Sequence, residues 1–238
     1  MKPATIRAVL FDIDGTLVDD AGAVSVALTA FHATYGQELG LNFSALMRQW
    51  QDLLDIHYAR FLRNEISMQD QRRERIRSLF LSSRPDLSVS LADRLFGEYE
   101  RYYREAWTPY PDVKVTLGRL KHFILGTLSN GDAAQQTEKL RLCGLLPFFT
   151  RTFASSEIGF AKPAPEAFGA VCKHLGVQPD ECVYVGDRLD VDARASFSAG
   201  LRGVWLDRAG DKTDVHEGIS VIDSLKKLPA LLGEGSFK

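Results

Sequence analysis

Short apolar runs alternate with segments of helical pattern over the second half of the chain, and this alternation restricts the fold more than any other feature. The predicted strands span residues 123–129, 152–154, 182–186, 203–206 and 219–222. The predicted helices between them span residues 132–143, 165–175 and 192–199. Strands and helices that alternate in this way form a parallel sheet with helices on both faces. We therefore expect an α/β fold with a doubly wound, Rossmann-like parallel sheet.

A further strand is expected near the N-terminus, where Ile6-Arg-Ala-Val-Leu-Phe-Asp12 is apolar up to its last residue. Gly15 then permits a tight turn. In doubly wound sheets the ligand site lies beyond the carboxyl ends of the strands. Asp12, Ser129 and Asp187 each come at the end of an apolar run. We expect these three side chains to converge at one edge of the sheet.

Residues 20–104 have a different character, because their pattern is helical and contains no convincing strand. Apolar positions with helical spacing include Leu46, Trp50 and Leu53. The proline-containing segment Thr108-Pro-Tyr-Pro-Asp112 then separates this region from the strands that follow. We expect two domains, an α/β core of residues 1–19 and 105–238 and a helical domain of residues 20–104.

Composition and charge exclude several classes of protein. The net charge of -2 and the pI near 6.2 argue against a nucleic-acid-binding protein, which usually has a strongly basic face. The basic run of residues 72–77 is interrupted by Glu74, which predicts a solvated helix face. The three cysteines form no metal-binding pair, and the early apolar run is too short for a membrane span. We expect a cytoplasmic protein without a membrane partner.

The first acidic cluster is Asp12-Ile-Asp14, where two carboxylates lie two residues apart after a strand. Carboxylates this close repel each other unless a positive charge lies between them. Oxygen-rich sites suit Mg²⁺. The sequence around Asp12 and Asp14 therefore favours a site for a divalent cation, although a D-x-D pair also occurs at ordinary turns.

Four motifs in order carry a resemblance to a known family. The string D-I-D-G-T-L-V-D begins at Asp12, L-S-N-G-D contains Ser129, K-P-A-P-E-A-F begins at Lys162, and G-D-R-L-D-V-D contains Asp187 and Asp192. Together they resemble the four motifs of the haloacid dehalogenase (HAD)-like hydrolase superfamily. The position of the helical region between the first and second motifs resembles the phosphatase branch with an inserted all-helical cap domain.

The resemblance implies a role for each matching residue. Asp12 is the nucleophile that forms an aspartyl phosphate, and Asp14 is the general acid and base. Ser129, Asn130 and Lys162 bind the phosphoryl group. Mg²⁺ is the implied cofactor, held by Asp12, Asp14 through its backbone carbonyl, and Asp187. Asp192 is expected near Lys162 or the waters of the metal, and Asp190 is expected to cap the next helix.

The family resemblance implies a Mg²⁺-dependent phosphohydrolase that acts on a small phosphorylated metabolite. The stretch from Ser129 to Leu140 resembles members that act on nucleoside monophosphates or sugar-like phosphates. Three alternatives stay open: a phosphomutase with the same nucleophile, a haloacid dehalogenase, and a non-catalytic phosphate-binding module. Asp14 argues against the dehalogenase, because a halide leaves without needing a proton. The sequence leaves the oligomeric state open.

Overall fold

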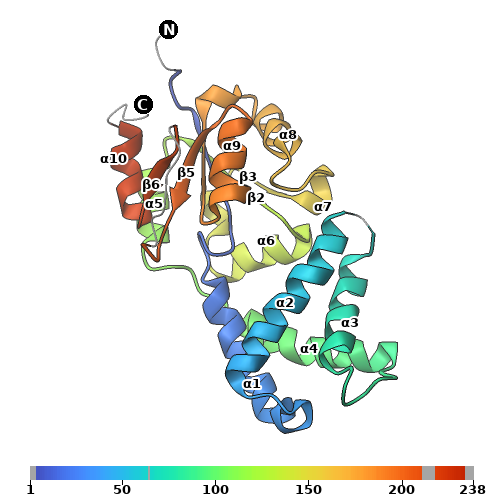
Figure 1. The fold of residues 1–238 in the computed structure, drawn as a ribbon. Coiled ribbons are helices and arrows are strands. Elements are labelled where there is room, and N and C mark those ends of the chain that lie inside the picture. Colours follow the sequence, from blue (N-terminus) through green and yellow to red (C-terminus); the bar gives the residue numbers. More distant parts are fainter. Residues whose placement is uncertain (1–3, 64, 211–217, 234–238) are drawn as a thin grey trace. The chain divides into compact units, whose positions relative to one another are not determined.

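The computed structural model describes residues 4–63, 65–210 and 218–233. The chain divides into two compact units (Figure 1). One unit combines the residues up to Asp19 with those from Thr108 onward, and the other runs from Asp20 to Trp107. The first unit contains the sheet, and the described regular elements of the second are all helices.

The sheet of the first unit has six described strands, all parallel, in the order β3-β2-β1-β4-β5-β6. Their bounds are β1 (Ala8–Phe11), β2 (Ile124–Ser129), β3 (Arg151–Ala154), β4 (Cys182–Gly186), β5 (Arg202–Leu206) and β6 (Ser220–Ile222). The central strands β1 and β4 are fully buried, as a parallel sheet covered on both faces requires. The predicted α/β fold with a doubly wound parallel sheet is confirmed.

Helices cover both faces of this sheet. They are α5 (Val113–Arg119), α6 (Ala133–Leu142), α7 (Ser155–Ile158), α8 (Pro165–Leu175), α9 (Ala195–Ser198) and α10 (Leu228–Gly233). Phe168 and Val171 of α8 and Ala195 of α9 share one buried cluster with Ala8 and Leu10 of β1. Figure 1 shows α5 and α10 on the opposite side of the sheet.

The region after β4 departs from the sequence prediction of one helix over residues 192–199. The chain first forms a π-helical turn, η3 (Leu189–Arg194), and α9 follows it directly. Short 3₁₀ turns, η1 (Leu146–Phe148), η2 (Pro179–Glu181) and η4 (Leu225–Lys227), complete the unit. The early start of η3 brings Asp192 to a fully buried position.

The helical unit consists of α1 (Asp20–Leu39), α2 (Phe43–Leu62), α3 (Met68–Leu79) and α4 (Val89–Glu105). Asn42, Ser67 and Ser88 begin α2, α3 and α4, and each side chain accepts a backbone N–H of the first turn. Aromatic and aliphatic side chains from all four helices form one core. No described helix of the chain is both long and apolar enough to cross a membrane.

Arg75 contradicts the prediction that residues 72–77 form a solvated face. Its side chain is buried, and its guanidinium lies 4.4 Å from the ring centroid of Trp50 and 5.2 Å from that of Phe96. Burial lowers the pKa of Arg75 to about 10. The aromatic faces attract the cation, and the local charge pattern of α3 gives no sign of them because they come from α2 and α4.

Candidate active site

Asp12 is the first polar side chain beyond strand β1. The backbone N–H of Asp12 donates to the Val185 carbonyl at 2.9 Å, which ties the strand tip to β4. In the register of the sheet, Phe11 lies between Thr127 of β2 and Val185 of β4. The carboxyl ends of these three neighbouring strands therefore meet, and they carry Asp12, Ser129 and Asp187 to one edge as predicted from the apolar runs.

Lys162 places a buried ammonium group among the carboxylates. Its Nζ lies 2.8 Å from Asp12 Oδ1 and 2.7 Å from Asp192 Oδ1, and it donates to the Tyr184 hydroxyl at 2.8 Å. Only 3% of the Lys162 side chain is exposed. Burial alone would lower the pKa of Lys162, but Asp12 and Asp192 outweigh burial and raise it. The group is a fixed positive charge at the tip of β1.

Asn130 holds the backbone of Lys162. Its Nδ2 donates to the Lys162 carbonyl at 2.7 Å, and its Oδ1 accepts the Lys162 N–H at 2.8 Å. Asn130 is predicted to bind the phosphoryl group, and in the structure its amide makes this two-point contact to the backbone of Lys162. Asn130 thus joins the loop after β2 to the loop that carries the lysine, and it sets where the ammonium lies.

Three carboxylates form a tight acidic cluster. Single oxygens of Asp12, Asp187 and Asp192 all lie within 4.8 Å of one another. Burial raises the pKa of Asp12 well above its ordinary value, even against the charge of Lys162. Burial and the charge of Asp192 raise the pKa of Asp187 to about 6. One lysine does not balance three carboxylates, and this oxygen-rich donor set fits a hard divalent cation.

Gly15 and its neighbours shape the wall beside Asp187. The backbone φ of Gly15 is +78°, and a Cβ built there would lie 2.3 Å from Asp187 Oδ2. Thr16 donates its hydroxyl to Asp187 Oδ1 at 3.3 Å, and Trp205 donates its indole N–H to the Asp187 carbonyl at 2.9 Å. The turn therefore needs glycine for conformation and for space.

The carboxylate of Asp14 turns to helix α6. Gln136 Nε2 donates to Asp14 Oδ2 at 2.8 Å, and Lys139 Nζ forms an ion pair with Asp14 Oδ1. Burial by itself raises the pKa of Asp14, but Lys139 and Gln136 outweigh it and lower the pKa below its usual value. The side chain is 30% exposed. Asp14 is the acidic residue of the D-x-D pair that lies outside the three-carboxylate cluster.

Ser129 and Asp132 belong to the loop between β2 and α6. Ser129 is almost fully buried, and its hydroxyl makes a long 3.4 Å contact to the Asn130 carbonyl. Asp132 begins α6 and accepts the N–H of Gln135 at 2.8 Å. This capped helix start fixes the loop that carries Ser129.

Asp190 does not cap the following helix, contrary to the prediction. It lies inside η3, whose N-cap is Arg188, and its carboxylate pairs with Arg194 at 2.5 Å on the surface. Asp192 takes the ordering role instead, because its Oδ2 accepts the N–H of Arg188 at 3.0 Å. Because the π-helical turn already starts at Leu189, Asp190 lies inside it, and Asp192 is the residue that accepts the N–H of Arg188.

A family model described as haloacid dehalogenase-like hydrolase matches residues 6–200. The chain belongs to this family. The match includes all four motifs and the helical region between the first and the second. The predicted family is therefore confirmed, and this haloacid dehalogenase-like hydrolase is an enzyme.

Proteins that are similar over most of the chain include phosphatases. The hydrolase is 35% identical to a glyceraldehyde 3-phosphate phosphatase of Methanopyrus kandleri, over 85% of this chain and 84% of that protein. It is 27% identical to the N-acylneuraminate-9-phosphatase of Rattus norvegicus, over 98% and 96%. A HAD hydrolase of Bacillus subtilis, crystallised with magnesium, matches with a TM-score of 0.77 at 25% identity, over 97% of this chain and all of that one.

Sequence reasoning missed three residues of the haloacid dehalogenase-like site: Gln136, Lys139 and Tyr184. Gln136 and Lys139 lie three residues apart on α6, so they share one helix face, and both are buried. Two polar residues with this spacing within the helix predicted over residues 132–143 were the available signal. Tyr184 donates its hydroxyl to the Leu128 carbonyl at 2.7 Å, and its signal was a hydroxyl within a fully buried strand.

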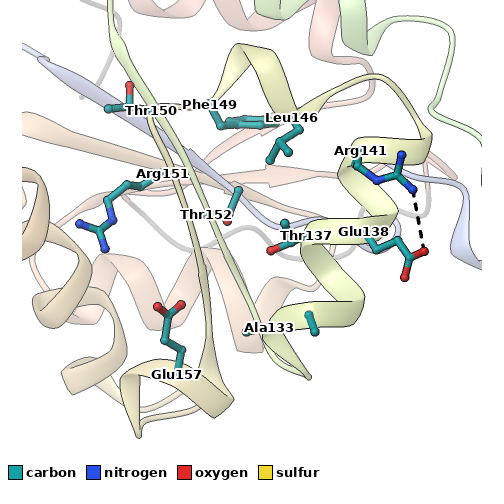
Figure 2. A pocket seen from close by; sticks show the side chains of 11 residues that line it. Ala133, Thr137, Glu138, Arg141, Leu146, Phe149, Thr150, Arg151, Thr152 and Glu157 are labelled. Atoms are coloured by element: carbon teal, nitrogen blue, oxygen red, sulfur yellow. Dashed lines mark ion pairs between the residues drawn. The ribbon is translucent and has the colours of Figure 1, made fainter.

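A hollow of about 750 Å³ lies elsewhere on the hydrolase, along the edge strand β3 and helix α6 (Figure 2). Thr137, Arg141, Arg151 and Glu157 are among the residues that line it, and Arg141 pairs there with Glu138 at 3.9 Å. The lining includes none of the predicted site residues. The chemistry of the family motifs is therefore separate from this hollow.

Proposed function

We propose that this hydrolase removes phosphate from small phosphate monoesters, with Mg²⁺ as cofactor and Asp12 as nucleophile. The observation that carries the proposal is the Asp12 carboxylate at the tip of β1, paired with buried Lys162 and clustered with Asp187 and Asp192. A phosphoryl group needs both a nucleophile and positive charge to balance its oxygens. The relatives that are phosphatases support the same class of substrate.

In the first step an Asp12 oxygen forms a bond to phosphorus while the bond from phosphorus to the ester oxygen breaks. Asp14 enters this step in its protonated form, the minor form given its lowered pKa, and gives the proton to the departing alkoxide, which leaves as an alcohol. In the second step a water oxygen attacks phosphorus, Asp14 accepts the proton of that water, and the bond to Asp12 breaks. Inorganic phosphate leaves, and both carboxyl groups return to their starting states.

Positive charge around the phosphoryl group comes from two sources. Lys162 binds phosphoryl oxygens together with the hydroxyl of Ser129, and Asn130 fixes the loop that carries the lysine. The carboxylates of Asp12 and Asp187 and the backbone carbonyl of Asp14 would hold Mg²⁺. When bound, Mg²⁺ would neutralise negative charge on the nucleophile and the phosphate. Asp192 orients Lys162, with which it is paired at 2.7 Å.

We infer that the helical unit Asp20–Trp107 acts as the cap that selects the substrate. One relative acts on glyceraldehyde 3-phosphate and another on an N-acylneuraminate 9-phosphate, so we propose a sugar-like phosphate with a primary ester as the substrate class. The three cysteines are free and buried, which supports our inference that the enzyme works in the reducing cytoplasm.

The test is turnover of 4-nitrophenyl phosphate by the full chain, with Mg²⁺ and with EDTA. Turnover should require Mg²⁺, and Asp12→Asn should lose it by more than about a thousandfold, because the amide is a poor nucleophile. Asp190→Asn is the matched control, since that carboxylate is exposed and pairs only with Arg194 among the described contacts. Activity of Asp12→Asn within about tenfold of wild type would exclude the covalent mechanism.

The substrate class is tested with a panel of phosphate esters and a direct measurement of released phosphate. The panel contains glyceraldehyde 3-phosphate, an N-acylneuraminate 9-phosphate, phosphoserine and a nucleoside monophosphate. A sugar-like phosphate should have the highest kcat/KM. Transfer of the phosphoryl group to a second hydroxyl of the sugar, without release of phosphate, would instead identify a phosphomutase.

A further inference from the structure

Both oxygens of the Asp14 carboxylate are held by one helix. Lys139 Nζ contacts Oδ1, and Gln136 Nε2 donates to Oδ2 at 2.8 Å. Both partners come from α6, which begins directly after the loop that carries Ser129. The family motifs that suggested the site include neither Gln136 nor Lys139. The contact therefore links the residue expected to transfer protons to the helix that begins after the loop carrying Ser129.

Gln136 and Lys139 are both more deeply buried than the Asp14 carboxylate that they contact. Lys139 is 1% exposed and Gln136 is 7% exposed, whereas the Asp14 side chain is 30% exposed. A buried lysine with a carboxylate partner gives little net stability compared with an apolar residue, because both charges lose their hydration. Stability alone therefore does not explain why a lysine occupies this position. An effect of Lys139 on Asp14 does explain it.

We propose that Lys139 and Gln136 are positioning residues that fix the orientation of the Asp14 carboxylate for proton transfer. The inference rests on the proposed function, in which Asp14 protonates the leaving group and deprotonates water. Proton transfer needs heavy atoms about 2.6–3.2 Å apart. A carboxylate that is one-third exposed and held at neither oxygen samples several rotamers, and most of them miss this distance.

Gln136 is suited to hold Asp14 through the whole cycle. Its Nε2 donates to the carboxylate, while its Oε1 is buried and accepts no hydrogen bond within the described part of the chain. An amide has a donor end and an acceptor end. By turning its amide, Gln136 keeps a hydrogen bond to Asp14 when the carboxyl group carries a proton. Lys139 has donors only and favours the charged carboxylate.

The test compares Lys139→Met and Gln136→Met with Arg141→Met, a matched control on the same helix. The Arg141 side chain is 62% exposed and pairs with Glu138. For an alkyl phosphate, kcat should fall about 10- to 100-fold in the two site variants, with KM changed less than about twofold. For an aryl phosphate the loss in kcat should be several times smaller. Arg141→Met should keep wild-type values for both esters.

A double-mutant cycle with Asp14→Asn decides whether the two residues act through Asp14. In that background, Lys139→Met or Gln136→Met should change kcat by less than about twofold, because the group they position is already lost. The same loss in both backgrounds, or equal losses for alkyl and aryl esters, would overturn the inference. If Lys139→Met does not give the circular dichroism of a folded chain, Gln136→Met alone decides.

The outcome for wild type separates this inference from the proposed function. If the wild-type chain hydrolyses neither ester with Mg²⁺, the proposed function fails, and the inference fails with it. If wild type is active and the variants are additive with Asp14→Asn, only the positioning role is refuted.

Discussion

Lys162→Met tests whether one buried cation holds the acidic cluster together. Methionine has a similar length but no charge, so the change leaves Asp12 and Asp192 buried without their ammonium partner. Their side chains are 9% and 0% exposed, and both lie within 2.8 Å of Nζ. Removing one partner of a buried ion pair costs about 3–5 kcal/mol. The two pairs share one cation, so their contributions are not added.

The expected loss is large enough for a simple thermal unfolding measurement. For a chain of this size, 1 kcal/mol shifts Tm by about 2–4 °C, so the variant should unfold about 6–20 °C below wild type. The measurement uses EDTA at about pH 8. Without the charge of Lys162, which lowers the pKa of Asp12, the raised pKa of that carboxyl rises further. A raised carboxyl pKa adds stability as pH falls, so the deficit should shrink towards about pH 5.

Two comparisons make the result specific. Lys227→Met removes an exposed ion pair to Asp223 and should cost no more than about 1 kcal/mol. Mg²⁺ should stabilise Lys162→Met more than it stabilises wild type, because it restores positive charge to the cluster. A Tm of Lys162→Met equal to that of wild type in EDTA would refute the idea that the lysine stabilises these carboxylates.

The remaining predictions concern the other site residues. Gly15→Ala should weaken Mg²⁺ binding in a calorimetric titration, because the new Cβ would lie 2.3 Å from Asp187 Oδ2; unchanged affinity would mean that the turn relaxes freely. Mg²⁺ affinity should fall as pH drops through about 6, where the Asp187 carboxylate takes up a proton, and the raised pKa of Asp12 adds to the same trend. Affinity independent of pH would count against Asp187 as a ligand. Asp14→Asn should reduce hydrolysis of alkyl phosphates about 10²- to 10⁴-fold and that of aryl phosphates less, and equal losses would argue against proton donation by Asp14.

Local sequence was sufficient for most of the sheet. Strand β4 and helix α8 have the predicted bounds, Cys182–Gly186 and Pro165–Leu175. A continuous apolar run that ends in a Gly-Asp pair leaves little choice for β4, and a proline in the first turn with a glycine after the last defines α8. Because parallel strands end at one edge, the sequence also predicted that Asp12, Ser129 and Asp187 come together.

The partners of these residues depend on contacts that no local pattern contains. Lys139 is 125 residues away from Asp14 in the chain, and Lys162 is 30 residues away from Asp192. The burial of Arg75 against Trp50 and Phe96 and the π-helical start of η3 likewise depend on neighbouring elements. Apolar spacing by itself determines which residues face the interior and where each strand ends. Which charged groups meet there depends on how the helices pack on the sheet, because a buried charge is tolerated only where packing brings it a partner.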